Sequence, residues 1–506
     1  MSATKVLAAA VAAGMVAWGA WADGPTTLAE CLARALENNL DLNIQRLSRK
    51  ESGMDRDIAR GGYDPELSLT AQRRHEESKG ESAGTAAGAL ETVESDSDED
   101  SFGASVGGLL PGVGTRYEVT AREGTAEGTR GGNPFDTSTA GVGASVTQPL
   151  LKGFKTDETR WRVATAELGD EAAALELERK AQELAGKVER AWHTLAQARA
   201  ETEAQREGLR LAEQLLEDNR RKVKIGAMSS LDEKQAESQA ASMRAALAGA
   251  RQSEREAENS LKHLISPDWR AVREERLETD GDWRATREEV DAARALELAL
   301  ERRPDVKKAR LEVESQELAA AFYRNQRLPS LNVVGGAWLA ASGENSRSDA
   351  WQTVGDADEP YWTLGVTFSM PLGNRAAKGR HRQAVAAAER KALEARRTEE
   401  EALLEVDNAL AALEPGWERV EATRDAREYA EQALAAEQAK LERGRSTSFV
   451  VLEMQKNLTA ARKDEIAAST GYRQCLSVLS LAEGTIFDRH GIEWGDGGNK
   501  MGDGRF

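Results

Sequence analysis

Side chains able to perform acid–base, nucleophilic or metal chemistry are scattered along this chain. The sequence contains neither an HExxH nor a CxxC motif. It also lacks a P-loop, so the chain is not the ATPase of an exporter. The glycine-rich stretches GVGTRY and GVGASV fall in expected strands, with no helix after them to bind phosphate. Catalysis and metal binding need several reactive side chains at defined spacing, and we therefore predict no enzyme, no metal and no cofactor. The five histidines show no paired spacing: His75, His193, His263, His381 and His490.

The two cysteines, Cys31 and Cys475, do not indicate a reactive site. Cys31 lies on the apolar side of an expected helix and fits a small buried residue better than a lipid-modified one, because Glu30 beside it is not small. A disulfide between the two is permitted in an oxidising compartment, but the sequence alone leaves that pairing open.

The composition points to long helices in an exported protein. Charged residues make up 30% of the 506 residues, aromatic residues 5%, and the net charge of −18 argues against nucleic acid as a partner. Residues 1–22 have a lysine, an apolar stretch and an A-x-A pattern, which predicts a signal peptide cleaved after Ala22; the alternative is an N-terminal membrane anchor. Beyond residue 22 the sequence contains no run of 18 apolar residues, so no transmembrane helix is expected. A β-barrel stays possible, because the alternating residues of its strands barely raise the hydropathy.

An internal repeat organises the rest of the chain. Residues 27–42 (TLAECLARALENNLDL) align with 291–306 (DAARALELALERRPDV), and each unit then reads as strands, a long helix, a glycine turn and a returning helix. We predict repeat 1 at 23–284, repeat 2 at 285–487 and a flexible tail at 488–506.

The helices of each repeat have recognisable ends. Thr27 with Glu30 forms a capping box, and Asp291 caps the second copy; these first helices should end near Gly61 and Arg327. Long helices are expected at 150–224 and 372–443, with Pro415 bending or breaking the second, and returning helices at about 228–265 and 446–482. A coiled-coil seam has 3-4 spacing: Leu209, Ala212, Leu216, Asn219 and Val223.

Strands are expected at about 63–148 in repeat 1 and 330–371 in repeat 2. Stretches of about ten alternating residues suit tilted membrane strands, and four aromatic residues lie where an interface girdle would sit, although an ordinary soluble hairpin is the alternative. Residues 81–100 are acidic and of low complexity, so we expect a solvated, mobile loop. Repeat 1 holds about one extra hairpin, and whether it joins the wall of a barrel or folds over its mouth stays open. The aromatic residues are Trp338, Tyr361, Trp362 and Phe368.

These features together resemble the TolC-like outer-membrane efflux proteins over nearly all of 27–487. The resemblance rests on the tandem repeat and on the glycine turns. It also rests on the motifs at the strand ends: Pro-Glu-Leu at Pro65 and Pro-Ser-Leu at Pro329 enter strands, and Gln-Pro-Leu-Leu at Pro149 and Met-Pro-Leu at Pro371 leave them. It implies an α+β membrane protein: a trimeric TolC-like fold whose shared transmembrane β-barrel continues into a long periplasmic α-helical barrel. The four prolines would mark strand–helix transitions.

The resemblance also implies roles for residues at the glycine turns. The turns would form the periplasmic tip that contacts an adaptor protein, although they could simply reverse the chain. Many relatives carry two aspartates around the pore, and at those positions this chain has Val450 and Glu453. Glu453, and more weakly Asp232, would constrict the pore. The alternative is that Glu453 is an ordinary solvated glutamate on the helix surface. The expected tip residues are Ile225, Gly226, Ala227, Met228, Gly444, Arg445, Ser446 and Thr447.

The function implied is an outer-membrane exit duct of a tripartite efflux pump or type I secretion system in a Gram-negative bacterium. Its expected partners are two further copies of the chain, a periplasmic adaptor, an inner-membrane transporter and outer-membrane lipid. Two alternatives stay open: a secreted structural or adhesive coiled-coil protein without a pore, and a periplasmic hydrolase, for which no catalytic grouping is found.

Overall fold

The computed structural model describes residues 26–83, 90–130, 133–277, 282–344, 347–356, 360–495 and 500–501. The expected signal peptide, 1–22, lies outside the described residues. The chain forms two compact units: a helical unit (Met1–Ser48, Ala174–Lys308 and Arg396–Phe506) and a sheet unit (Arg49–Ala173 and Ala309–Ala395). Each is described by itself.

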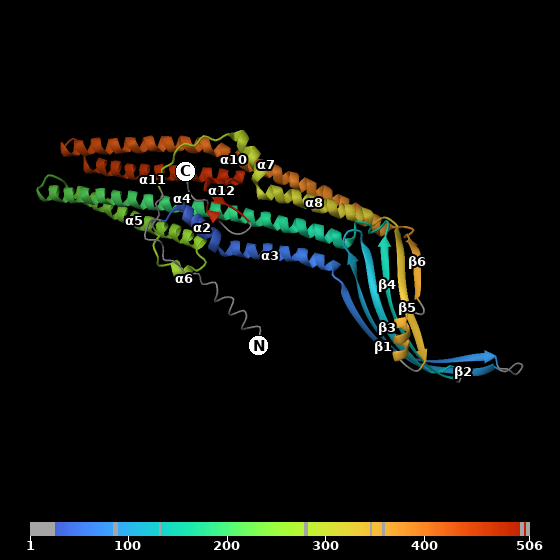
Figure 1. Cartoon of the computed structure of the whole chain (residues 1–506). Coiled ribbons are helices and arrows are strands. Elements are labelled where there is room, and N and C mark those ends of the chain that lie inside the picture. The colour runs from blue at the N-terminus through green and yellow to red at the C-terminus, as the bar shows by residue number, and fades with distance from the viewer. Residues whose placement is uncertain are drawn as a thin grey trace. The chain divides into compact units, whose positions relative to one another are not determined.

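The sheet unit is built on one antiparallel sheet of six strands in the order β1-β2-β3-β4-β5-β6 (Figure 1). The pairing of β4 with β5 joins the strands of the two repeats. The extra hairpin of repeat 1 therefore belongs to the same sheet as the strands of repeat 2. The strands are β1 (Glu66–Ala83), β2 (Leu90–Leu110), β3 (Thr115–Arg130), β4 (Asn133–Pro149), β5 (Ser330–Glu344) and β6 (Pro360–Ser369).

The acidic stretch predicted as a mobile loop is largely strand, so that expectation was wrong for 81–83 and 90–100. The register places basic residues opposite acidic ones: Lys79 pairs with Glu94, and Arg73 with Asp100. Lys79 Nζ lies 2.7 Å from Glu94 Oε1. Opposite charges directly across a strand pair stabilise it, which explains why a sequence of low hydrophobicity forms a ladder here.

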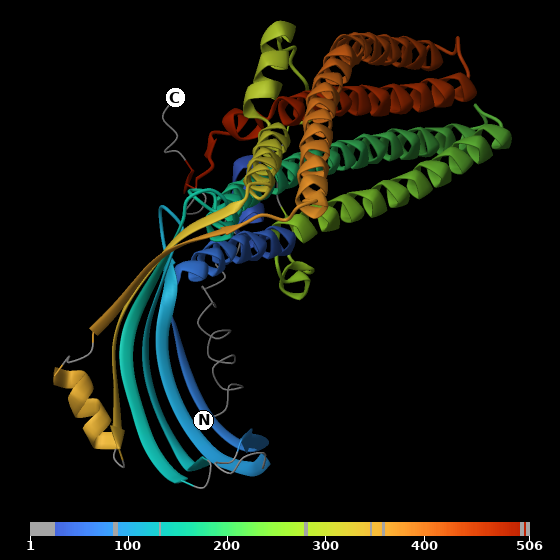
Figure 2. The ribbon, with the colours of Figure 1, turned by 90° about the vertical axis from the view of Figure 1, so that its right-hand side faces the viewer.

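A short helix that the sequence did not suggest, α9 (Arg347–Asp356), lies in the connection between β5 and β6. Figure 2 shows it beside the sheet. Its Ala350 and Val354, one turn apart, are buried against Ala140 and Ala341 of the sheet. The polar loop expected between the two strands thus contains a packed helix.

The helical unit contains two helical hairpins, in each of which a returning helix lies beside the part of a long helix that belongs to this unit (Figures 1 and 2). The first is α4 (Glu158–Lys224) with α5 (Ser230–Ile265), and the second is α10 (Arg375–Glu442) with α11 (Ser448–Glu483). One apolar cluster draws side chains from all four, including Ala212, Ala236, Leu434 and Val451. The predicted seam is confirmed at Ala212, Leu216 and Asn219, which are buried.

Each first helix is broken in two, which the sequence reading did not anticipate. The pieces are α2 (Leu28–Asn38) and α3 (Leu40–Arg60) in repeat 1, and α7 (Ala292–Arg302) and α8 (Pro304–Asn325) in repeat 2. Asn39 at the first break has extended backbone and accepts hydrogen bonds from the amides of Asp41 and Leu42. Arg303 at the second break precedes Pro304, and a residue before proline disfavours helical backbone.

The two long helices depart from prediction at two points. Helix α4 begins at Glu158 rather than 150, because Gly153 and Lys155 have positive φ and form a turn after β4. Helix α10 runs through Pro415 without a break, so of the two expected effects of the proline, a bend or a break, the break does not occur. Trp417 and Val420, just after the proline, are buried in an apolar cluster with Tyr472, and this packing supports the helix where a hydrogen bond is lost.

The expected flexible tail is packed for its first residues. Within the tail predicted at 488–506, Ile492 of β7 (Ile492–Glu493) is buried in the main apolar cluster of the helical unit. Ile486 and Phe487 of α12 (Ile486–Arg489), just before the predicted tail, are buried in the same cluster. Asp488 pairs with Arg302, and β7 pairs with β8 (Lys500–Met501). Residues 496–499 and 502–506 lie outside the described part.

Two further findings bear on the sequence analysis. Within the described residues, no helix is both long and apolar enough to cross a membrane. Cys31 is buried as expected, and the disulfide with Cys475 that the sequence permitted is not formed.

Candidate functional site

One face of the six-stranded sheet is apolar, and we call it the apolar face. Residues directly opposite one another in a sheet project from the same face, and the register aligns Leu67, Val106, Val119 and Ala144 across four strands. Trp362 on β6 continues this row and is 76% exposed. So much exposed apolar surface is unusual in a protein surrounded by water. Other exposed members are Leu69, Phe102, Val146, Leu364, Val366 and Phe368.

The opposite face, which we call the polar face, carries small and hydroxyl-bearing residues. Ser68, Ser105, Thr120 and Gly143 stand in one row across β1 to β4. The neighbouring rows add Gln72, Ser101, Glu118, Arg122, Thr139 and Ser145. The alternation along every strand therefore separates a face suited to hydrocarbon from a face suited to water.

Beyond its apolar residues, the apolar face of the sheet also carries charged side chains on β1, β2 and β3. On β1, Arg73 follows Ala71 on the same face, with its Nε 3.8 Å from Asp100 Oδ1. On β3, Glu123 accepts a hydrogen bond of 2.9 Å from Trp351 Nε1 of α9 and pairs with Arg347 at 3.4 Å. A boundary between apolar and charged rows is what a membrane interface requires.

The sheet has two unpaired edges within the described residues, β1 and β6. Unpaired edges expose backbone donors and acceptors and favour pairing with another chain. Both edges of the sheet can therefore pair with a further strand.

The four predicted transition prolines all lie at strand ends. Pro65 precedes β1, Pro329 precedes β5, Pro149 ends β4, and Pro371 follows β6. Asn325 connects α8 to the turn after β4, because its Oδ1 accepts a 2.8 Å hydrogen bond from the amide of Gly153. Contacts of this kind fix where strand gives way to helix, a role that proline spacing alone did not reveal.

The two predicted glycine turns are equivalent in geometry. Gly226 has φ +72° and Gly444 has φ +69°, and the residue after each donates its amide to a carbonyl of the preceding helix. This is the left-handed cap that commonly ends a helix. Both turns are exposed, with Ile225 79% exposed. The remaining predicted tip residues, Ala227, Met228, Arg445, Ser446 and Thr447, follow the two glycines directly.

The predicted constriction residues have different surroundings. Asp232 belongs to the capping box of α5, where its Oδ2 accepts a 3.3 Å hydrogen bond from the amide of Ser229. Glu453 projects from α11 with its side chain 47% exposed, and the nearest cation is Lys456 at 3.9 Å. Asp232 therefore stabilises the start of α5, whereas the exposed Glu453 carboxylate has no comparable structural hydrogen bond among the described residues.

Sequence analysis missed a buried cluster around Glu189, because two of the histidines described as scattered meet there. Glu189 on α4 is 3% exposed; its Oε1 lies 3.8 Å from His193 Nε2, and its Oε2 lies 3.3 Å from His490 Nε2. Burial alone would raise the pKa of Glu189, but the two imidazoles hold it well below its usual range. His193 is one turn along the same helix, so i,i+4 spacing was the only available signal.

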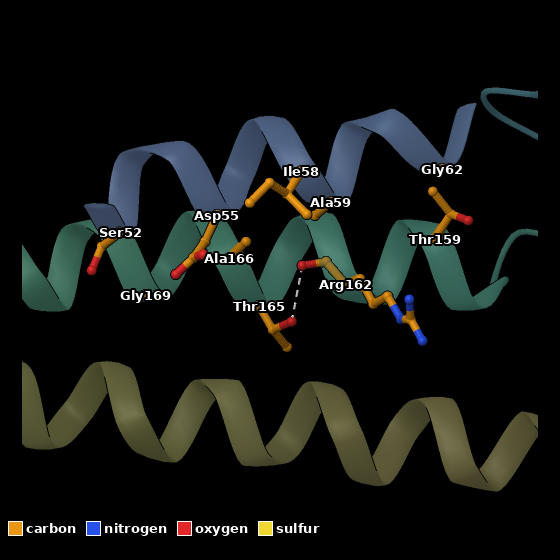
Figure 3. Close-up of a pocket in the computed structure, with 10 residues that line it drawn as sticks. All are labelled: Ser52, Asp55, Ile58, Ala59, Gly62, Thr159, Arg162, Thr165, Ala166 and Gly169. Atoms are coloured by element: carbon orange, nitrogen blue, oxygen red, sulfur yellow. Dashed lines mark hydrogen bonds between the residues drawn. The ribbon is translucent and has the colours of Figure 1, made fainter. Parts of the chain in front are cut away.

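An open groove of about 410 Å³ lies between α3 and α4 in the sheet unit (Figure 3). Ser52, Asp55 and Ile58 approach it from α3, while Arg162 and Thr165 approach from α4. The Thr165 hydroxyl donates to the Arg162 carbonyl of its own helix at 3.0 Å, and Ile58 is 73% exposed. These side chains form no nucleophile–base pair. In the described part of the chain, no group of three or more His, Cys, Asp or Glu side chains is placed so that it could hold a metal ion.

Comparisons with known proteins agree with this architecture. Three solved structures share the fold: the CmeC outer membrane channel of Campylobacter jejuni (15% identity, 90% of this chain and 85% of that chain, TM-score 0.64), the outer membrane protein VceC of Vibrio cholerae (19%, 90% and 96%, 0.63) and the MtrE outer membrane channel of Neisseria gonorrhoeae (17%, 90% and 88%, 0.60). No curated protein matches the sequence. The model of the family described as "Outer membrane efflux protein" matches residues 93–266 and 295–485. These segments cover more than half of the chain, which therefore belongs to the outer membrane efflux protein family.

Proposed function

We propose that three copies of this chain form the outer-membrane exit duct of a tripartite efflux pump or type I secretion system. The duct would receive cargo from an inner-membrane transporter and a periplasmic adaptor and release it outside the cell. The observation that carries the proposal is the two-faced sheet, with an exposed apolar face, a polar face and two unpaired edges. Family membership supports the outer membrane as the location.

The dimensions of the apolar face suit a bilayer. The rise along β5 from Leu331 to Ala341 is about 34 Å at ~3.4 Å per residue. A strand tilt of ~40° reduces this to about 26 Å, close to the ~25 Å apolar band of outer-membrane barrels. Three sheets joined by pairing β1 of one copy with β6 of the next would close a barrel of eighteen strands, with the polar face lining its lumen.

The helical hairpins would form the periplasmic part of the duct. The exposed turns at Gly226 and Gly444 are the proposed adaptor contacts, and Glu453 and Asp232 are the proposed constriction residues. Opening would be a shift between packed arrangements of the hairpins, driven by an adaptor that binds one arrangement better than the other. The duct needs no catalytic residue and no cofactor for this task.

Negative-stain imaging of chain 23–506, extracted from outer membranes in detergent, tests the proposal. We expect a trimeric tapered cylinder with a detergent belt at one end, and the protein should resist carbonate extraction. A monomer, or a rod that washes off membranes without detergent, would favour the pore-free structural coiled coil instead.

A further inference from the structure

A tryptophan lies flat against the polar face of the sheet, where small and hydroxyl-bearing residues otherwise predominate. The pyrrole edge of the Trp338 indole lies over Gly143, its direct neighbour on β4, and the benzene edge lies over Gly336. A Cβ at either glycine would collide with the ring. The two glycines therefore provide the space in which the indole rests on bare backbone.

Tyr361 extends this aromatic surface across to β6. It is the direct partner of Trp338 in the sheet, with ring centroids 5.5 Å apart and planes 13° from parallel. Tyr361 is 51% exposed and Trp338 is half-buried. Neither side chain makes a hydrogen bond within the described residues, so the indole N–H and the phenol are both available to a ligand.

The aromatic pair borders a hollow of about 760 Å³ that crosses the polar face. Its floor is backbone at Gly103, Gly124 and Gly141, which keeps the hollow wide. Its polar side chains come from four strands: Thr70, Gln72, Glu99, Ser101, Glu118, Thr120, Arg122, Thr139 and Ser145.

Three charged side chains of this hollow form no ion pair with a described residue: Glu99, Glu118 and Arg122. Arg122 and Glu118 flank Thr120 on β3 and project from the same face. Thr120 stands in the same row as Trp338, two strands away, or about 10 Å at ~4.8 Å per strand. Trp338 therefore lies about 10 Å from Thr120, with the donor Arg122 and the acceptor Glu118 on either side of that threonine. This spacing leaves room for one sugar-sized ring between the aromatic surface and the polar side chains.

We propose that Trp338 and Tyr361 form a carbohydrate-binding platform on the lumen wall, so that the cargo of the duct carries a sugar moiety. A pyranose ring presents a C–H face with slight positive charge, which suits the negative face of an aromatic ring. Its rim of hydroxyls both donates and accepts, which suits Arg122, Glu118 and Thr120. Glu99 and Glu118 can accept from such hydroxyls, and Arg122 can donate to them. The proposal rests on the proposed function, because only closure of the barrel turns the polar face inward.

Current block in planar bilayers tests the platform, with maltoheptaose as the probe and the full-length trimer as the sample. We expect the sugar to reduce the open current of the native channel reversibly. Trp338→Ala should raise the half-blocking concentration at least fivefold, and Trp338→Phe, which keeps a ring, should raise it less. Native current that is insensitive to maltoheptaose, or equal block in Trp338→Ala, would overturn the proposal.

Two controls separate the platform from the channel and from folding. Trp362→Leu removes the next aromatic residue of β6 from the opposite face and should leave the block unchanged. Tyr361→Leu weakens the platform without uncovering the glycines, and it replaces Trp338→Ala if that variant assembles poorly. Calorimetric titration of the detergent-solubilised trimer needs no pore: sugar binding without conductance refutes the duct, whereas conductance without sugar binding refutes only the platform.

Discussion

The hydroxyl of Ser448 donates a 2.9 Å hydrogen bond to the side-chain oxygen of Asn219, joining residues that are 229 positions apart. Both residues are fully buried. Asn219 also donates to the carbonyl of Asp232 at 3.3 Å. One amide near the glycine turns therefore connects the end of α4, the start of α5 and the start of α11, and so holds the two helical hairpins together.

Removing this hydrogen bond should loosen the tip of the hairpins. Ser448→Ala leaves a buried amide oxygen without its partner, at a cost of about 1–3 kcal/mol. We expect faster amide hydrogen exchange at 215–240 and 445–455, measured by mass spectrometry on the detergent-solubilised trimer. Ser230→Ala, an exposed serine near the first turn, is the matched control. Unchanged exchange in Ser448→Ala would mean that apolar packing alone holds the hairpins together.

Glu453 offers a test of ion selectivity. A threefold ring of carboxylates attracts cations, and this side chain is half exposed with only a 3.9 Å approach to Lys456. Glu453→Gln should therefore lower the preference for cations, seen as a smaller reversal potential in a salt gradient. Asp464→Asn removes an exposed acid from the same helix, farther from the turn, and should have little effect. Equal reversal potentials for native protein and Glu453→Gln would remove Glu453 from the constriction.

The features predicted from sequence were those with local causes. The glycine turns were predictable because left-handed backbone favours glycine at Gly226 and Gly444, and the buried seam followed from the spacing of Ala212 and Leu216. The helix break at Arg303 was readable in principle from Pro304, yet the strength of the surrounding apolar pattern concealed it.

The missed features depend on which distant segments meet. The acidic strand of 90–100 needs the basic residues of β1 opposite it, and its own composition indicates disorder. His490 approaches Glu189 only because Ile486 and Phe487 anchor the segment in the core. The Trp338 platform depends on Gly143, which is a neighbour through sheet register alone.

Acid should weaken the helical unit through Glu189. Its pKa is lower in the folded chain than the ordinary 4.5, so the carboxylate contributes stability above that pH, and the contribution is lost as the pH falls toward the folded value. We expect Glu189→Gln to lower the melting temperature at neutral pH and to flatten its decline below about pH 5. Thermal unfolding from about pH 3 to pH 7 measures both effects.

Glu217→Gln supplies the control for this pH series. It removes an exposed acid from the same helix, and no described residue pairs with it. Its melting curve should follow that of the native protein at every pH. If Glu189→Gln also follows the native curve, the cluster does not contribute to acid sensitivity.

Alanine at the glycine turns should destabilise the tip for a purely conformational reason. A Cβ at Gly226 or Gly444 would meet no atom within 4 Å, so a clash cannot explain any loss. Positive φ costs a residue with a side chain about 1–2 kcal/mol, and each variant should expose the turn to faster hydrogen exchange. Gly249→Ala is a control with the opposite sign: it lies within α5, also in open space, and alanine should stabilise a helix interior by up to about 1 kcal/mol. Equal effects at Gly249 and Gly226 would show that the left-handed backbone of the turn does not require glycine.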